Sequence, residues 1–303
     1  MVFLLTIAAD AFLGVGWVLQ QQVAAHTRSS DDRPLRALRK LIGTPVWWGG
    51  IAAMAAGQSL AAWALQSGAV ALVEPLLVGC LLCAFAFAAW RGRERVALGE
   101  LVGTLVVVGG VALFIAAAQP HADVRTQPTL VAVLAATVGV AVVAAVLVVG
   151  GGLAGRRKRI AVQSVAFAAA AGVCYALQDL STRGAIDVVS QHSLGRLVAT
   201  TWPYVLLGAA TAGVLMSQAA FRAARLDWSL PSTVAAQPIV AVPMAVWLLG
   251  DELRHTVVTI PLEALSLPLT VFGVVIVGRS GALRRAHGLK ANRLAEAEPA
   301  GQP

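Results

Sequence analysis

Charged side chains are scarce in this sequence. Asp, Glu, Lys and Arg make up 13% of its 303 residues, whereas hydrophobic residues make up 58%. A soluble domain of this length needs many polar side chains on its surface, because that surface meets water. The mean hydropathy of +0.77 therefore excludes an ordinary soluble protein. A lipid bilayer removes the requirement, since its interior is itself apolar.

Groups that could carry catalysis are also few. None of the five histidines lies deep inside an apolar run, and the patterns H-E-x-x-H and G-x-S-x-G and the phosphate-binding loop are missing. An intramembrane hydrolase needs a nucleophile paired with a base inside the helix bundle, and the sequence offers no such pair. We therefore expect neither an enzyme nor a bound cofactor.

Cysteines number only three. Cys80 and Cys83 form a C-x-x-C spacing, but they lie within an apolar run and have no second pair, and Cys174 lies within another run. A zinc or redox site needs polar neighbours that stabilise the thiolate. We interpret all three cysteines as small packing residues.

Long apolar runs are what the sequence does contain. A membrane-spanning helix needs about 20 mostly apolar residues, and such runs lie at 2–24, 44–66, 69–90, 98–118, 128–150, 161–180, 198–221, 229–249 and 260–278. A membrane β-barrel would alternate polar and apolar residues, whereas Thr137 is the only polar side chain in 131–149. The sequence predicts an all-α polytopic membrane helix bundle of about nine transmembrane helices.

The basic residues indicate an orientation in the membrane. If every run crosses the bilayer, 19 of the 23 Lys and Arg residues fall on the side of the C-terminus. The other four are Arg125, Arg183, Arg196 and Arg254. The positive-inside rule places the larger group in the cytoplasm. We expect a multi-pass protein of a bacterial plasma membrane, with its N-terminus outside. The net charge of +8 then reflects topology and contact with anionic membrane lipids, not nucleic acid.

An internal repeat relates the two halves of the chain. Residues 14–21 match 172–179, Gln58 matches Gln218, and residues 92–95 match 250–253, so the three offsets lie between 158 and 160. The first run thus maps onto the sixth, and a shift of five helices inverts the second copy across the membrane. Inverted repeats are a transporter architecture, with the substrate site near the midplane between the halves.

The repeat also suggests the domain boundaries. Residues 1–150 contain the first membrane repeat and a central helix, and residues 151–279 contain the second repeat. Residues 280–303 are polar and end in a stretch rich in Ala, Glu and Pro. Such a composition buries too little apolar surface to fold, so we expect a disordered cytoplasmic tail.

Several segments resemble the drug/metabolite transporter superfamily. Residues 217–231, followed by Gln237-Pro238 and Gly250-Asp251-Glu252, resemble its pattern of a polar helix and then a Pro-containing helix that ends in Gly-x-Glu. The resemblance covers nearly the whole membrane portion and implies a transporter. The superfamily usually has ten helices. One helix is therefore missing here, or a tenth helix or re-entrant segment lies near 181–197.

The first half is more similar to the NIPA-type branch, whose eukaryotic members are magnesium transporters. Residues 47–50, 54–58 and 64–76 carry this similarity. Two positions differ from the branch pattern, which has an acid where Gln58 stands and a hydroxyl residue where Glu74 stands. Because divalent cations prefer negatively charged oxygen ligands, Glu74 is the metal-ligand candidate if the chain carries such a cation.

Polar groups inside apolar runs mark the candidate transport pathway, because they are costly in hydrocarbon unless they face the bundle interior or water. Asp10 and Glu74 lie well inside their runs, and Pro75 frees a backbone carbonyl one turn earlier, which can line a cavity. Helical spacing places Asp10, Trp17 and Gln21 on one face of the first helix, and the repeat places Tyr175 and Asp179 on the matching face of the sixth. The candidates together are Asp10, Trp17, Gln21, Gln58, Glu74, Tyr175, Gln178, Asp179, Tyr204, Gln218 and Gln237.

Three functions are compatible with this pattern. The first is a secondary transporter that moves a small organic solute by alternating access, with Asp10 or Glu74 as the carboxylate that couples transport to protons. The second is a magnesium or other divalent-cation transporter that depends on Glu74. The third is a membrane scaffold without a transport cycle, in which the polar faces pack together and leave no cavity.

Overall fold

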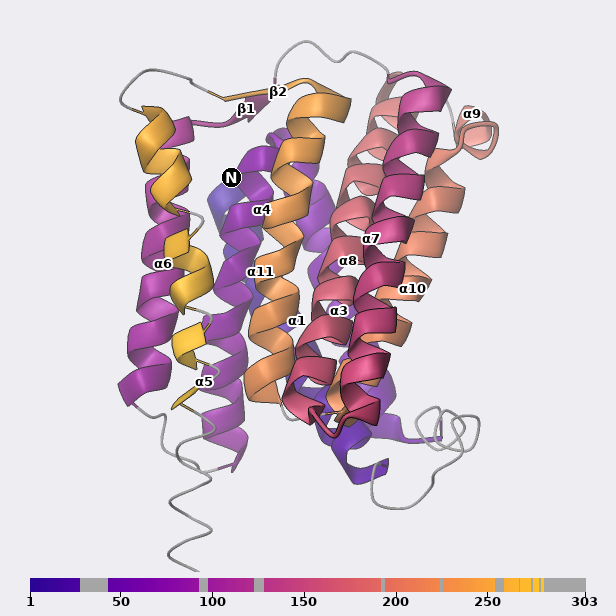
Figure 1. Ribbon diagram of the computed structural model, residues 1–303. Helices are drawn as coiled ribbons and strands as arrows, with labels where there is room; N and C mark the ends of the chain where they lie inside the picture. Colours follow the sequence, from indigo (N-terminus) through magenta and orange to yellow (C-terminus); the bar gives the residue numbers. More distant parts are fainter. Residues whose placement is uncertain are drawn as a thin grey trace, which may run out of the picture.

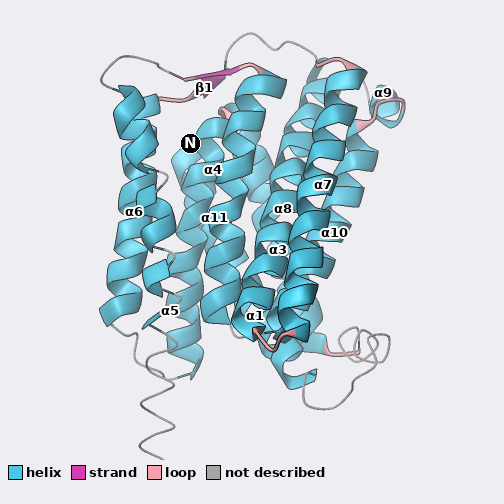
Figure 2. Cartoon of the chain, in the orientation of Figure 1, coloured by secondary structure: helices cyan, strands magenta, loops and turns pink. Residues whose placement is uncertain are grey.

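The computed structural model describes residues 1–27, 43–92, 98–122, 128–191, 194–223, 226–253 and 259–280, apart from the single residues 267, 274 and 278. Figure 1 shows long helices that run side by side, and Figure 2 shows that most of the described chain is helical. The elements are α1 (Val2–Thr27), α3 (Pro45–Ser67), α4 (Val70–Leu76), the 3₁₀ turn η1 (Leu77–Gly79), α5 (Cys80–Gly92), α6 (Leu98–Ala118), β1 (His121–Ala122), α7 (Leu130–Arg156), α8 (Ile160–Gln191), α9 (Leu194–Val198), α10 (Trp202–Ala223), α11 (Leu226–Met244), the π-helical turn η2 (Ala245–Leu249) and β2 (Asp251–Glu252).

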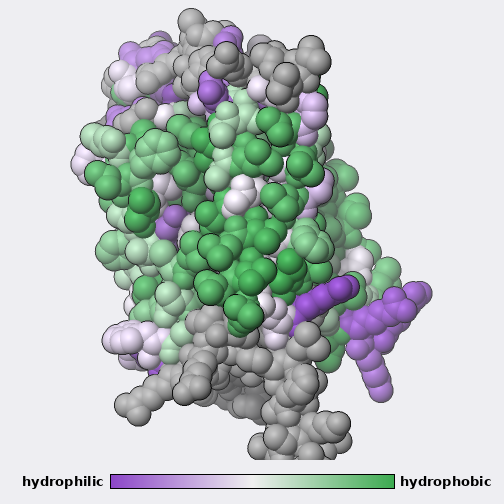
Figure 3. All heavy atoms as spheres, turned by 90° about the vertical axis from the view of Figure 1, so that its left-hand side faces the viewer, coloured by the Kyte–Doolittle hydropathy of each residue, from purple (hydrophilic) through white to green (hydrophobic). Residues whose placement is uncertain are grey.

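The predicted fold class, an all-α polytopic bundle, is confirmed. Within the described residues, 8 spans are long and apolar enough to cross a membrane, and the last of them is Thr259–Val277. α3 has 23 residues and packs along α1 as a further helix of the bundle. The chain is a multi-pass membrane protein. Figure 3 shows the corresponding hydrophobic band around the middle of one face, with hydrophilic residues mostly at its ends.

The helices alternate in direction, so the two copies of the repeat run oppositely. α1 starts at the upper end of the view in Figure 1, whereas α8 starts at the lower end. α1 packs most extensively against α3 and α5, and α8 packs most extensively against α10 and α11. In each copy, the later helices therefore pack mainly against the first helix.

Two glycines related by the repeat allow this central packing. A Cβ atom built on Gly14 would lie 2.6 Å from the backbone nitrogen of Ala84 in α5. One built on Gly172 would collide with the carbonyl oxygen of Thr233 in α11 and lie 2.9 Å from the Cβ of Ala236. Small residues at such positions let membrane helices approach closely without a side chain between them.

We expect Gly172→Ala to destabilise the bundle by about 1–3 kcal/mol, because overpacking forces α8 and α11 apart. Gly139 is the matched control, since it lies in α7 and a Cβ atom there meets nothing within 4 Å. Thermal unfolding in one detergent measures both changes. Equal melting temperatures for Gly172→Ala and Gly139→Ala would contradict the close approach of α8 and α11.

Three segments differ from the sequence-based boundaries. The run 161–180 was predicted too short, because α8 continues through the polar residues 181–191 to Gln191. The run 69–90 is interrupted by the 3₁₀ turn η1, which follows α4 and begins two residues after Pro75. No tenth spanning helix exists among the described residues of 181–197, since α9 has only 5 residues.

Described basic residues separate by side as the sequence predicts. α5, α7 and α10 end at the lower side of Figure 1, and their last turns carry Arg91, Arg156 and Arg222. α9, which carries Arg196, lies at the upper side. α7 continues to Arg156, so the sequence-based boundary at residue 150 falls within this helix. The tail from residue 281 onward lies outside the described residues.

Candidate functional site

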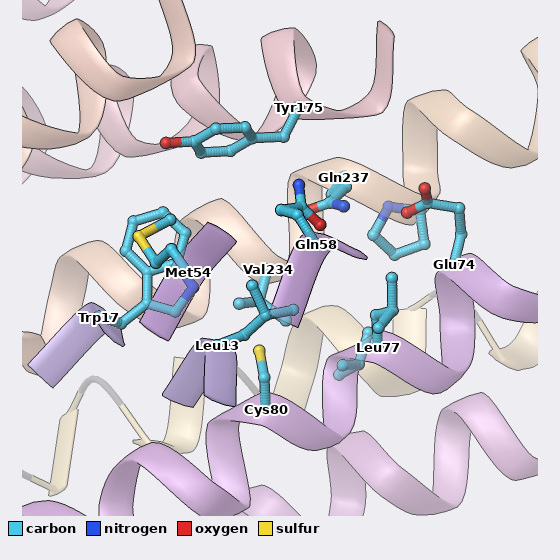
Figure 4. A pocket seen from close by; sticks show the side chains of 12 residues that line it. Leu13, Trp17, Met54, Gln58, Glu74, Leu77, Cys80, Tyr175, Val234 and Gln237 are labelled. Atoms are coloured by element: carbon cyan, nitrogen blue, oxygen red, sulfur yellow. The ribbon is translucent and has the colours of Figure 1, made fainter. Parts of the chain in front are cut away.

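A cavity of about 30 Å³ lies between the two halves, and we call it the central cavity (Figure 4). The first half contributes α1, α3, α4, η1 and α5, and the second half contributes α8 and α11. Its lining residues are Leu13, Trp17, Met54, Gln58, Glu74, Leu77, Val78, Cys80, Tyr175, Val234, Gln237 and Pro238. Five of the sequence-predicted candidates, namely Trp17, Gln58, Glu74, Tyr175 and Gln237, therefore surround one space.

Two buried acids from different halves lie beside each other here, and we call Glu74 and Asp179 the carboxyl pair. Glu74 lines the cavity, and Asp179 is bonded to the lining residues Gln58 and Gln237. Glu74 is 1% exposed and Asp179 is 2% exposed. The Gln237 side chain donates a hydrogen bond of 2.7 Å to Asp179 Oδ2, and Gln178 donates one of 3.4 Å to Oδ1. Gln58 also bonds to Asp179. The amides therefore hold Asp179 in place from three helices.

Glu74 is held less firmly. Its carboxyl group interacts with the Asp179 carboxyl and the Gln237 amide, although neither of its oxygens has a partner within strict hydrogen-bonding geometry. In the described part of the chain, neither member of the carboxyl pair forms a salt bridge with a basic side chain. Burying an unpaired negative charge is very costly. Two neighbouring carboxyl groups in hydrocarbon are thus stable only with a shared proton or a bound cation.

The two aromatic residues that the repeat relates, Trp17 and Tyr175, touch each other between the halves. Their ring centroids are 5.6 Å apart and the planes meet at 77°, an edge-to-face contact. The Tyr175 hydroxyl lies 3.3 Å from Ser217 Oγ in α10, and Trp17 also packs against Phe221 at 5.7 Å. This aromatic wall closes the cavity opposite Glu74, as Figure 4 shows.

A second polar contact between the halves joins α1 to α10. Gln218 Nε2 donates to Gln20 Oε1 at 2.5 Å, and Gln20 Nε2 lies 2.6 Å from Met54 Sδ. In the repeat, Gln20 corresponds to Gln178 and Gln218 to Gln58, and both of these amides bond to Asp179. Helical spacing predicts Gln21 on the inner face of α1, but Gln21 is only half-buried. The buried amide is that of its neighbour Gln20, which packing against α10 turns toward the bundle interior.

Asp10 and Tyr204 lie outside the central cavity. Asp10 is buried against Gly79, accepts a hydrogen bond from the Cys80 backbone amide, and leaves Oδ1 without a partner. It therefore lies against the break between α4 and α5. Tyr204 is 62% exposed on the outer face of α10, where its hydroxyl donates to the Val198 carbonyl. The prediction that Tyr204 lines the transport pathway is wrong, because its side chain lies on the lipid-facing side of α10.

A buried cation lies at the upper end of the bundle. Arg183 follows the predicted apolar run 161–180, but in the structure it lies within α8 and is 6% exposed. Its guanidinium donates hydrogen bonds to the carbonyl oxygens of Leu65 and Gly68 at the end of α3, the latter at 2.6 Å, and pairs with Asp187 at 3.3 Å. A cation at a helix C-terminus is favourable, because the unpaired carbonyls there carry partial negative charge. The i,i+4 spacing of Arg183 and Asp187 was the sequence signal.

Asp251 accepts a hydrogen bond from an amide at the start of α4. Gly250 adopts a left-handed conformation with φ of 74°, and the chain then brings the Asp251 carboxylate to the amide of Ala71 at 2.9 Å. Burial raises the pKa of Asp251, while the amides of Ala71 and Val70 and the charge of Arg183 act against that rise. We call Arg183 and Asp251 the upper clamp, since both come from the second half and hold the α3–α4 turn of the first half.

The strand pair β1–β2 lies at the same upper end. β1 and β2 run antiparallel, with His121 opposite Glu252 and Ala122 opposite Asp251. This short pairing joins the connection that follows α6 to the residue that caps α4. It therefore links a second segment of the first half to the upper clamp.

Comparisons with known proteins assign no activity to this architecture. No family model and no solved structure matches the sequence. The chain is similar to an uncharacterized protein of Corynebacterium glutamicum, with 23% identity over 251 residues. The match covers 83% of this chain and 85% of that protein. It is longer than either half, so the similarity extends across both.

Proposed function

We propose that this chain is a secondary transporter in which two inverted halves alternate around the carboxyl pair. The observation that carries the proposal is the position of Glu74 and Asp179, which are buried beside a cavity between the halves and have no basic partner among the described residues. A group in this state binds and releases a proton or cation as its surroundings change. The resemblance to the drug/metabolite transporter superfamily agrees with this role, and we infer membership from the motifs.

The upper clamp supports an alternating cycle. Opening the upper end requires the α3–α4 turn to leave Arg183 and Asp251, whereas opening the lower end leaves these bonds intact. With the basic side in the cytoplasm, the clamp closes the outer end, and the protein lies in a bacterial plasma membrane with its N-terminus outside. The central cavity beside Trp17, Tyr175 and Glu74 is not expected for a scaffold that only packs helices together.

The size of the central cavity favours a small cation as a second candidate cargo. A volume of about 30 Å³ holds about two water molecules, since each needs roughly 10–15 Å³ measured in this way. An organic solute would need the halves to move apart before it could enter. The oxygens of Glu74, Asp179, Gln58 and Gln237 suit Mg²⁺, which binds one or two carboxylates and keeps several waters.

Reconstituted protein tests the proposal. Proteoliposomes are exposed to steps of pH, of Mg²⁺ or Mn²⁺, and of a panel of amino acids and small organic amines, and charge movement is recorded on a solid-supported membrane. We expect saturable currents for at least one of these probes and their loss in Asp179→Asn. Glu252→Gln is the control, because this acid is exposed at the upper end. Currents absent for every probe, or unchanged in Asp179→Asn, would overturn the proposal.

A further inference from the structure

A second cavity lies on the lipid side of the bundle, and we call it the side cavity. Its volume is about 70 Å³. It lies between α4, α6, α11 and the helix Thr259–Val277 and shares only Pro238 with the central cavity. The lining residues are Pro75, Val111, Phe114, Ala235, Pro238, Ile239, Val242, Pro243, Ser266 and Thr270.

The lining offers nothing to a polar ligand. Its only hydroxyl groups already have acceptors within their own helix. Ser266 Oγ donates to the Glu263 carbonyl at 2.6 Å, and Thr270 Oγ1 donates to the Ser266 carbonyl at 2.9 Å. Prolines form three of the remaining positions and have no amide donor. A water molecule needs two to four polar partners to occupy a buried cavity, so this space excludes water.

The rim of the cavity lies on the apolar outer surface of the bundle. Its inner wall, formed by Pro75, Phe114 and Ala235, is buried. Its rim includes Ile239, which is 41% exposed, and the exposed Pro243. Large apolar side chains are exposed on the neighbouring helices, such as Leu105 on α6 and Phe272 on the last helix. The medium at the mouth of the cavity is therefore lipid hydrocarbon.

We propose that the side cavity binds the terminal methylene groups of one acyl chain of a membrane phospholipid, since about 70 Å³ has room for only a short part of the chain. An empty apolar cavity loses dispersion contacts along its whole lining, and a chain entering from the bilayer restores them without desolvating any polar group. The three prolines leave a gap here that neighbouring side chains do not fill. Because Pro75 follows Glu74 and Pro238 lines both cavities, the bound chain lies directly behind the carboxyl pair.

A photoreactive lipid tests this site. The protein is reconstituted in phosphatidylglycerol–phosphatidylethanolamine liposomes that contain a trace of phosphatidylethanolamine with a diazirine near the end of one acyl chain. After illumination, peptide mass spectrometry locates the adducts. We expect adducts concentrated on the α11 segment 235–243 and on α6 near Val111, and we expect them to saturate as the labelled fraction rises.

Filling the cavity should remove these adducts. Ala235→Phe places a ring in the space, and Ala235→Leu does the same with a smaller group if the first variant does not fold. Val138→Phe is the matched control, since Val138 is 61% exposed on the lipid face of α7. Loss of the α11 adducts in the Ala235 variants but not in Val138→Phe supports the site. Adducts spread evenly over all lipid-facing helices, or unchanged by filling, overturn it.

The melting temperature with and without added phospholipid provides an independent test of the site. Removing lipid with detergent should lower the melting temperature of the natural protein, and adding the phospholipid back should restore it by occupying the site. Ala235→Leu should respond less to the added lipid than Val138→Phe does. An equal response of the two variants would count against a discrete site, because a general bilayer effect acts on both.

Discussion

Replacing Glu74 with glutamine is expected to abolish coupled transport and to leave the bundle folded. The Glu74 carboxyl group contacts Asp179 and Gln237 but forms no hydrogen bond within strict geometry, so the change should cost little within the protein, and it removes one of two neighbouring acids. Removing one of two carboxylate partners from a buried, bound cation costs about 2–5 kcal/mol of its binding free energy. At 1.4 kcal/mol per tenfold, we expect cation affinity at the carboxyl pair to fall roughly 100-fold.

Two measurements separate this result from misfolding. The melting temperature of Glu74→Gln should equal or exceed that of the natural protein, because the amide needs no counter-charge in hydrocarbon. Currents evoked by pH or cation steps in proteoliposomes should disappear, while Glu252→Gln retains them. Full transport by Glu74→Gln would remove this residue from the mechanism. A large loss of stability would show that the Glu74 carboxylate forms an ion pair that the fold needs.

Arg183→Ala is expected to have the largest effect on stability. Removing one partner of a buried charged network costs about 3–5 kcal/mol, since Asp187 and Asp251 would lose their cation and the carbonyls of Leu65 and Gly68 would lose their donor. Thermal unfolding measures this change. Arg196→Ala is the matched control, because Arg196 is exposed in α9 near the same end of the bundle. Arg183→Lys should fall between the two, since an ammonium group cannot present the planar fork of donors.

The same variant should open the upper end. Cys80 lines the central cavity and is a free thiol, so a membrane-impermeant maleimide applied from the upper side reports access. In a background of Cys83→Ala and Cys174→Ala, we expect the labelling rate of Cys80 to rise when Arg183 becomes alanine or lysine. A labelling rate that stays at the value of the Arg196→Ala control would mean that the upper clamp does not close the cavity.

Sequence patterns predict the scaffold and part of the site because both follow from periodicity. Apolar length predicts the helices, and the repeat identifies Trp17 and Tyr175 as equivalent positions, which meet between the halves. The repeat also brings Gln58 to the same region as Asp179. These predictions succeed since an inverted pair of copies must place equivalent faces on the shared axis.

The remaining contacts depend on helix rotation and length, which the patterns do not specify. Gln20 and Gln21 differ by one position, and only packing against α10 selects the first. Tyr204 has the right spacing on α10, but its position lies on the lipid-facing side of that helix, whereas Trp202 beside it is buried. Arg183 was assigned to a loop because charged residues usually end a membrane span. Here the carbonyls at the end of α3 provide the polar environment that a buried guanidinium needs.

The carboxyl pair has an electrical consequence. A site without a compensating cation changes its net charge whenever it gains or loses a proton or metal ion, and it does so within the low-dielectric layer where the membrane voltage falls. Moving one elementary charge through that whole layer is worth about 2.3 kcal/mol per 100 mV. In the proposed cycle, the resting potential of the cell therefore acts on the step in which the empty site reorients, and it sets the preferred direction of net movement.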